Sequence, residues 1–114
     1  MSTLIIDVSD LETVKARLER AFRGEPQAQR YSFRSEARLL SMLTPDRWGL
    51  IKALTGADPL SGPELANRVG RDVTEVLSDA ERLVQCGLVD KTSEGKFHLP
   101  YEKVCVELVC QAAA

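Results

Sequence analysis

The sequence is poor in the residues on which catalysis and metal binding depend. It contains one histidine, His98, and three cysteines without Cys-x-x-Cys spacing, at positions 86, 105 and 110. A metal site needs more ligands at suitable spacing than these residues supply. Scattered cysteines in apolar surroundings are more often small buried residues in a reducing compartment. No glycine-rich loop precedes a predicted helix and no catalytic constellation is recognisable, so we expect no enzyme activity, no metal and no cofactor.

Long apolar runs and an excess of positive charge are also missing. No apolar run approaches the roughly 20 residues needed to cross a membrane, and no secretion signal is recognisable, so we expect a cytoplasmic protein with no membrane partner. The formal net charge is −2, which provides no global attraction to nucleic acid. Aromatic residues make up only 5% of the 114 residues, so a core must consist of Leu, Val, Ile and Ala. The length fits one domain.

The strongest pattern lies between Ser61 and Pro100. A short helix is predicted over Gly62–Val69, with Ser61 as its N-cap. After a tight turn, Asp72 is placed to cap a longer helix whose apolar residues follow the i, i+3, i+4, i+7 repeat of one buried face. These residues are Val73, Val76, Leu77, Ala80, Leu83 and Val84. Ser93-Glu94-Gly95 then predicts a hairpin between two short strands.

The segments before this pattern predict three helices and allow two strands. Met1–Val8 is predicted to form a short strand or a partner-binding edge, and Ser9 with Glu12 forms a capping box. The helix that follows has an apolar stripe and a basic opposite side, which is either a solvated face or a phosphate-contacting arm. Gln27–Phe33 allows another strand. Two further helices are predicted. One begins after Ser35, and the other covers Pro45–Leu54, with Thr44 as its N-cap and Trp48 as a core anchor.

The C-terminal segment Lys103–Cys110 is apolar on both sides of a strand pattern. A β-branched run of this kind is typical of a strand covered on both faces. We expect it to pair with a second copy or a different protein, and the alternative is that it completes the local core. The N-terminal amphipathic helix must also bury its stripe on something. Together they predict a dimer or partner interface at Leu11, Val14, Leu18, Phe22, Val104, Val106 and Leu108.

The residues Ser61–Val76, then Leu83–Lys91, then the turn at Gly95 resemble a winged helix-turn-helix. The predicted fold class is therefore α+β, mainly α with a small β wing. Residues 44–100 are expected to form the winged helix-turn-helix domain. Residues 1–43 are expected to form a strand and helix extension, and residues 101–114 a C-terminal strand and tail.

In that fold the second helix enters the DNA major groove and the wing contacts the flanking backbone. The exposed face near the start of the longer helix carries Arg71, Thr74, Glu75 and Ser78, which we predict to contact bases. Contacts with phosphates are predicted for Ser61, Lys91 and Lys96. The alternative for Arg71 is a pair with Glu75 within the helix, and for the two lysines it is plain surface charge. Between residues 44 and 100, nine acidic residues outnumber seven basic ones, which opposes DNA binding.

A wider pattern resembles a family of small prokaryotic transcriptional regulators with MarR-type winged helices, some of which act as TumA-type antitoxins beside a TumE-like toxin. It consists of Phe33–Leu40, Leu43–Trp48, Gly70–Val73 and the closing apolar strand. The resemblance implies a homodimer that binds double-stranded DNA and represses its own operon, with a toxin as a further partner. The alternative is an interaction protein that uses the winged helix only as a scaffold for a toxin or another protein.

Overall fold

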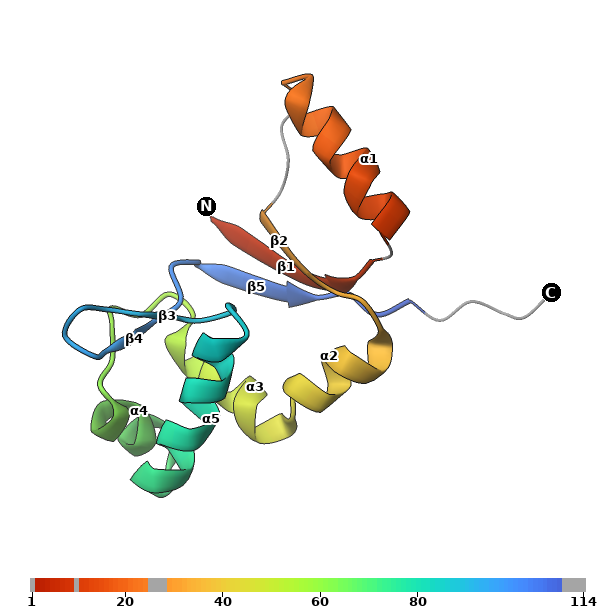
Figure 1. Ribbon diagram of the computed structural model, residues 1–114. Coiled ribbons are helices and arrows are strands. Elements are labelled where there is room, and N and C mark those ends of the chain that lie inside the picture. Colours follow the sequence, from red (N-terminus) through yellow and green to blue (C-terminus); the bar gives the residue numbers. More distant parts are fainter. Residues whose placement is uncertain (1, 10, 25–28, 110–114) are drawn as a thin grey trace.

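The computed structural model describes residues 2–9, 11–24 and 29–109, except for the side chains of Leu11 and Thr13. The described chain has an α+β fold, which confirms the predicted class at that level (Figure 1). In chain order its elements are β1 Thr3–Val8, α1 Leu11–Phe22, β2 Gln29–Phe33, α2 Glu36–Met42, α3 Pro45–Leu54, α4 Gly62–Val69, α5 Val73–Gln85, β3 Asp90–Lys91, β4 Phe97–His98 and β5 Lys103–Val106. None of the described helices is long and apolar enough to span a lipid bilayer.

Three strands from the two ends of the chain form one parallel sheet in the order β2-β1-β5. The central strand β1 pairs Leu4 with Gln29 on one side and with Val104 on the other. The strand predicted at the start of the chain is therefore confirmed, but the alternative of a partner-binding edge is wrong. β5 pairs with β1 of its own chain, so the local alternative is correct for that side of the strand. β5 lies at the edge of this sheet, and pairing of its other side with a second chain stays a prediction.

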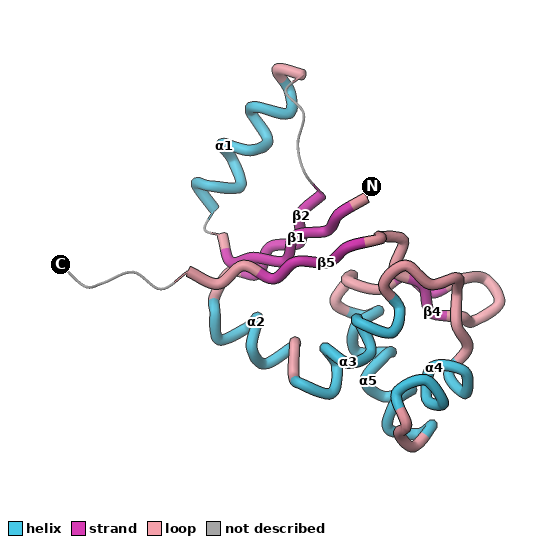
Figure 2. Tube along the Cα trace, turned by 180° about the vertical axis from the view of Figure 1, so that it is seen from behind, coloured by secondary structure: helices cyan, strands magenta, loops and turns pink. Residues whose placement is uncertain are grey.

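The sheet separates α1 from the other helices. Figures 1 and 2, from opposite directions, both show α1 alone on one side of the sheet and α2 to α5 on the other side. The predicted capping box at the start of α1 is wrong. The backbone N–H of Ser9 donates to the carbonyl of Phe33 at 3.0 Å, and the Ser9 hydroxyl donates to Asp7 at 3.3 Å. Pairing within the sheet thus occupies the group that Glu12 was expected to bind.

The other predicted helix starts are confirmed. Ser35 accepts a hydrogen bond from the backbone N–H of Arg38 at the start of α2. Thr44 does the same for α3, where Pro45 occupies the first turn. At the start of α4 both halves of a capping box are present, between Ser61 and Glu64. These side chains satisfy backbone donors that lack partners within the helix, which is why such local signals can be read from sequence.

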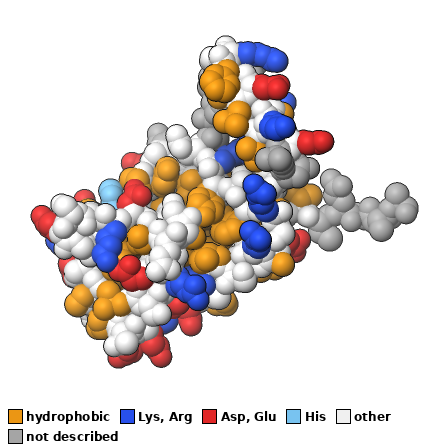
Figure 3. Space-filling view, in the orientation of Figure 1, with side chains coloured by type: hydrophobic (Ala, Val, Ile, Leu, Met, Phe, Trp, Pro, Cys, Tyr) orange, Lys and Arg blue, Asp and Glu red, His pale blue; other side chains and the backbone are white. Residues whose placement is uncertain are grey.

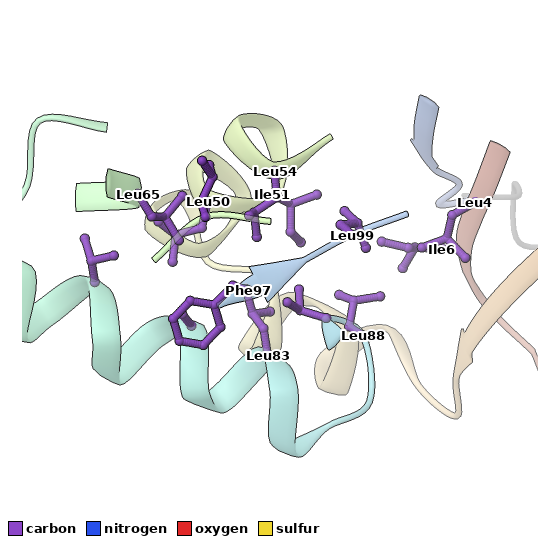
Figure 4. Packing of buried hydrophobic residues seen from close by; sticks show 14 of the residues in the cluster. Leu4, Ile6, Leu50, Ile51, Leu54, Leu65, Leu83, Leu88, Phe97 and Leu99 are labelled. Atoms are coloured by element: carbon purple, nitrogen blue, oxygen red, sulfur yellow. The ribbon is translucent and has the colours of Figure 1, made fainter. Parts of the chain in front are cut away.

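One apolar core joins the sheet to the helices (Figure 4). Leu4 and Ile6 reach it from β1, and the helices contribute the buried Leu50, Leu65 and Leu83. Phe97 from β4 is also buried, which anchors the hairpin in the same core. Trp48 is only partly buried at the edge of this core. The predicted core of Leu, Val, Ile and Ala therefore contains one fully buried aromatic ring, and Trp48 and three other aromatic side chains pack against its edge.

α4 and α5 cross very closely at Gly62. A Cβ atom added there would lie 2.5 Å from Cδ2 of Leu77, whereas one added at Gly49 of α3 would meet nothing within 4 Å. Leu77 therefore covers Gly62, and it remains 38% exposed instead of fully buried as predicted. Ala66 of α4 is also buried.

This crossing gives a matched pair of substitutions. Gly49→Ala should raise the free energy of unfolding by about 0.5–1 kcal/mol, because alanine favours the helix. Gly62→Ala should instead lower it by about 1 kcal/mol, because the new methyl group meets Leu77. Urea denaturation measures both, and Leu77→Ala should restore the gain at Gly62. If Gly49→Ala and Gly62→Ala change the unfolding free energy of the otherwise wild-type protein equally, the close crossing is contradicted.

Candidate nucleic-acid interface

The turn between α4 and α5 has three residues and a left-handed glycine. Gly70 has φ 68° and ends α4 with a hydrogen bond from its backbone N–H to the carbonyl of Ala66. Asp72 then caps α5, because its carboxylate accepts from the backbone N–H groups of Thr74 and Glu75 at 3.0 and 3.3 Å. The tight turn and the Asp72 cap were predicted from sequence, whereas the Gly70 cap was not. Together they fix the direction in which α5 leaves α4.

The first half of α5 presents a polar exposed face. Thr74, Glu75 and Ser78 are all exposed, on the side of the helix away from the buried Val76 and Ala80. Val73 was predicted to be buried but is 38% exposed, as is Leu77, because both lie at the margin of the apolar stripe. Three of the four predicted base-contacting residues are therefore accessible.

Arg71, the fourth predicted base-contacting residue, forms ion pairs within the domain. Its Nη2 lies 2.8 Å from Oδ2 of Asp79 and 3.9 Å from carboxylate oxygens of both Asp46 and Glu75. Arg47 of α3 binds the other oxygen of Asp79 at 3.1 Å, so one carboxylate joins the turn to α3 and α5. The pair with Glu75 considered from sequence is thus the weaker contact. The Arg71 side chain is only 20% exposed, which leaves it little reach beyond the protein surface.

The two arginines also control the charge of Asp79. Burial alone would raise the pKa of this carboxyl, but the hydrogen bonds from Arg71 and Arg47 outweigh burial and hold its pKa below the ordinary value. Asp79 therefore remains ionised at neutral pH as an internal partner. The Nη1 atom of Arg71 is buried without a hydrogen-bond partner, so this guanidinium is not fully satisfied.

Most acidic side chains of α5 have intramolecular partners. Asp72 caps the helix, Asp79 binds two arginines, and Glu81 pairs with Lys91 of the hairpin. Glu75 is the acidic residue of this helix that is exposed with only a long contact to Arg71. The repulsion that we expected between this helix and phosphates is therefore concentrated at one residue.

The hairpin lies against the helices and is fastened to the residue before α4. Leu60 and Phe97 exchange two backbone hydrogen bonds of 2.9 and 2.8 Å. Lys91 pairs with Glu81, and its ammonium lies 5.7 Å from the centre of the Phe97 ring. Lys96 is partly buried, and no ion pair joins it to a carboxylate within the described part of the chain. Of the two predicted phosphate-binding lysines, only Lys96 is without an ion pair there.

Ser61 is occupied by the capping box at the start of α4. Its hydroxyl accepts from the backbone N–H of Glu64, and the Glu64 carboxylate accepts from the backbone N–H of Ser61, both at 3.3 Å. Hydrogen bonds from the side chain and backbone of Ser61 lower the pKa of Glu64. A phosphate at this helix start would have to displace a carboxylate that is already bound.

Two exposed arginines complete the polar surface. Arg82 lies one helical turn after Ser78 and is exposed, and Arg68 is exposed in the last turn of α4. Helical spacing puts Arg82 on the exposed face of α5, so the sequence carried a signal for it that our list of DNA-contacting residues did not use. Nothing in the sequence distinguishes Arg68 from an ordinary basic residue near a helix end.

The residues predicted for a dimer or partner interface divide into two groups. Leu18 and Phe22 of α1 are 54% and 90% exposed, and Val106 and Leu108 are 37% and 44% exposed. Val14 is partly buried. Val104 instead packs against the chain's own core, because β5 pairs with β1, and the side chain of Leu11 lies outside the described residues. Within that description, no group of three or more His, Cys, Asp or Glu residues could hold a metal ion.

Comparison with known proteins identifies the family of this chain. The model of the HVO_A0114 family matches residues 42–106, from the end of α2 to the end of β5. The match covers more than half of the chain, and the chain belongs to this family. Neither the curated proteins nor the solved structures contain a match to it.

Proposed function

We propose that this member of the HVO_A0114 family is a DNA-binding transcriptional regulator in which α3, α4, α5 and the β3–β4 hairpin form a winged helix-turn-helix. The observation that carries the proposal is the exposed polar face of α5, which directly follows a three-residue turn containing glycine. Such a turn between two packed helices is typical of DNA-binding helix-turn-helix units. The hairpin fastened beside α5 corresponds to the wing.

In this proposal α5 lies in the major groove. Thr74 and Ser78 offer hydroxyl groups that can donate to or accept from base edges, and Glu75 can accept from a cytosine amino group. Arg68, Arg82 and Lys96 contact phosphates and fix the position of the helix. Arg71 serves the fold of the turn instead, because its guanidinium is bound to Asp79.

The proposal implies a modest electrostatic contribution. Three phosphate contacts for each copy correspond to a slope of about −3 for the logarithm of affinity against the logarithm of salt concentration, and about −5 for two copies. Binding by a single copy should be weak, so two copies on a symmetric site are expected. Autorepression, which the resemblance to small prokaryotic regulators implies, requires that this site lies upstream of the chain's own gene.

Fluorescence anisotropy with DNA from that upstream region tests the proposal. Affinity should fall with rising salt concentration at the slope given above, and Lys96→Ala should make this slope shallower by about 1 for each copy. Lys103→Ala removes the same charge from an exposed position on β5, away from α5, and should leave the slope unchanged. Ser78→Ala should cost about 1 kcal/mol of preference for the upstream site over unrelated DNA.

Two outcomes would contradict the proposal. One is the absence of binding at low salt and high protein concentration. The other is binding that Lys96→Ala and Lys103→Ala weaken equally, which would mean that the hairpin has no special part in it.

The second candidate function is a protein-binding scaffold, such as an antitoxin that holds a toxin. It is favoured by the ion pairs that occupy Arg71 and Lys91, since these remove positive charge from the proposed DNA surface. It predicts that the chain binds the product of a neighbouring gene and that substitutions at Ser78 and Lys96 leave this affinity unchanged. The same variants therefore separate the two functions.

A further inference from the structure

The helix α1 extends from the body with an apolar stripe that its own sheet does not cover. Phe22 is 90% exposed and Leu18 is 54% exposed. Val14, Leu18 and Ala21 form one wall of an open groove of about 480 Å³, and Gln29 and Ser32 of β2 lie on the other side. Figure 3 shows apolar side chains along α1 and on the body beneath it.

Polar contacts between α1 and the sheet fix the orientation of α1 relative to the body. Arg17 of α1 lies 3.4 Å from a carboxylate oxygen of the buried Asp7 and donates to the hydroxyl of Ser9 at 3.0 Å. Arg30 of β2 binds Asp7 at 2.7 Å, and Ser32 donates to it at 2.5 Å. We call Asp7, Ser9, Arg17, Arg30 and Ser32 the Asp7 cluster. Because these bonds orient the helix without burying its stripe, the stripe remains available to another surface.

A second apolar surface adjoins the base of α1, at the end of the sheet. Val8, Leu108 and Val109 are 37%, 44% and 75% exposed, and they line a cavity of about 300 Å³ together with the charged Asp7, Arg17, Glu36 and Glu107. With Leu18 and Phe22, these residues are five of the nine large apolar residues that are exposed in the described chain. Such a concentration of exposed apolar residues marks a protein interaction site.

The total surface area indicates how much the chain can still bury. The chain exposes 7581 Å², whereas a compact monomer of its mass exposes about 6,200 Å². Its radius of gyration is 15.6 Å, against about 13 Å for a compact domain of this length. The excess of about 1,400 Å² exceeds the roughly 800 Å² that each partner buries in a stable dimer.

We infer that a second copy of this chain docks on this face, with the two α1 helices antiparallel across a two-fold axis. Each copy offers both a projecting apolar helix and an uncovered groove, as a self-complementary interface requires. The inference does not depend on DNA binding.

Molar mass measured by sedimentation over a wide range of protein concentration tests the inference. The wild-type chain should reach twice its mass of 12.6 kDa. Leu18→Asp should raise the dissociation constant of the dimer at least about 10-fold. Leu40→Asp is the matched control, because Leu40 is 52% exposed, close to the 54% of Leu18, but lies on α2 across the sheet. It should leave the dimer unchanged.

Three results would overturn the inference. The first is a wild-type chain that stays monomeric at every concentration, even if it binds a different protein. The second is a dimer that Leu18→Asp leaves unchanged. The third is a dimer that Leu18→Asp and Leu40→Asp weaken equally. Far-UV circular dichroism checks that the variants fold. Phe22→Ser provides a second test, since its removal from a 90% exposed position cannot disturb the core, and it should weaken the dimer as Leu18→Asp does. Failure of DNA binding would leave these masses unchanged, so the two proposals fail separately.

Discussion

Replacing Arg71 by alanine is expected to lower the free energy of unfolding by about 2–3 kcal/mol, a large effect for a charged residue near the surface. The substitution removes the 2.8 Å bond to Asp79, whose side chain is only 19% exposed, and leaves that carboxylate to Arg47 alone. Because the Asp79 carboxylate is mostly buried, water cannot fully replace the lost guanidinium group, and the uncompensated charge destabilises the fold. Urea denaturation at neutral pH measures the loss.

A double-mutant cycle separates the ion pair from other effects of Arg71. Arg71→Ala and Asp79→Ala should each destabilise the protein, and the double variant should lose about 1–2 kcal/mol less than the sum. Arg82→Ala is the control, because Arg82 is exposed on α5 and should change stability by less than about 0.5 kcal/mol. Additive losses for Arg71 and Asp79 would show that their contact does not support the fold.

The same variant tests the assignment of Arg71 as a base-contacting residue, which stays a prediction from sequence. If Arg71 only positions the turn, folded Arg71→Ala protein should keep its preference among DNA sequences while losing affinity uniformly. A contact between Arg71 and a guanine would instead relax specificity at one base position. Binding to a set of single-base variants of the site distinguishes the two roles.

The local elements of this fold could be predicted because their signals lie within a few residues. The caps at Ser61 and Asp72 each satisfy N–H groups at most three positions away. The hairpin around Gly95 follows from one glycine with φ 81° between two short strands. In each case the residue type meets a requirement of the neighbouring backbone, whatever the rest of the chain does.

The sheet and the ion pairs could not be predicted because they join distant residues. Thr3 pairs with Lys103, so nothing near either residue specifies the partner. An apolar β-branched strand indicates only that both its faces are covered, which a second chain or the chain's own core could do. Arg71 was assigned from its place on a helical wheel, but Arg47 and Asp79, which decide its environment, meet it only after α3 packs on α5.

Replacing Asp7 by asparagine is the last substitution from which we expect a large effect, about 2–4 kcal/mol of unfolding free energy at neutral pH. The buried carboxylate binds Arg17 of α1 and Arg30 of β2. Its neutral replacement leaves Arg17 without its counter-charge and Arg30 with only Glu107, whose carboxylate lies 3.8 Å away. The measurement belongs in a Leu18→Asp background, where association of copies does not contribute to stability. Asp58→Asn makes the same change at an exposed position in the loop after α3 and serves as the control.

The effect of Asp7→Asn should depend on pH in a defined direction. Burial raises the pKa of Asp7, but hydrogen bonds from Ser32 and Arg30 and the charge of Arg17 outweigh it, so the pKa in the folded protein is lower than usual. A group of this kind stabilises the fold fully above its unfolded pKa of about 3.9, and this stabilisation is lost as the pH falls through the folded pKa. The difference in unfolding free energy between the wild-type and Asp7→Asn proteins should therefore shrink below about pH 4. A difference that stays constant down to low pH would show that the charge of Asp7 does not stabilise the fold.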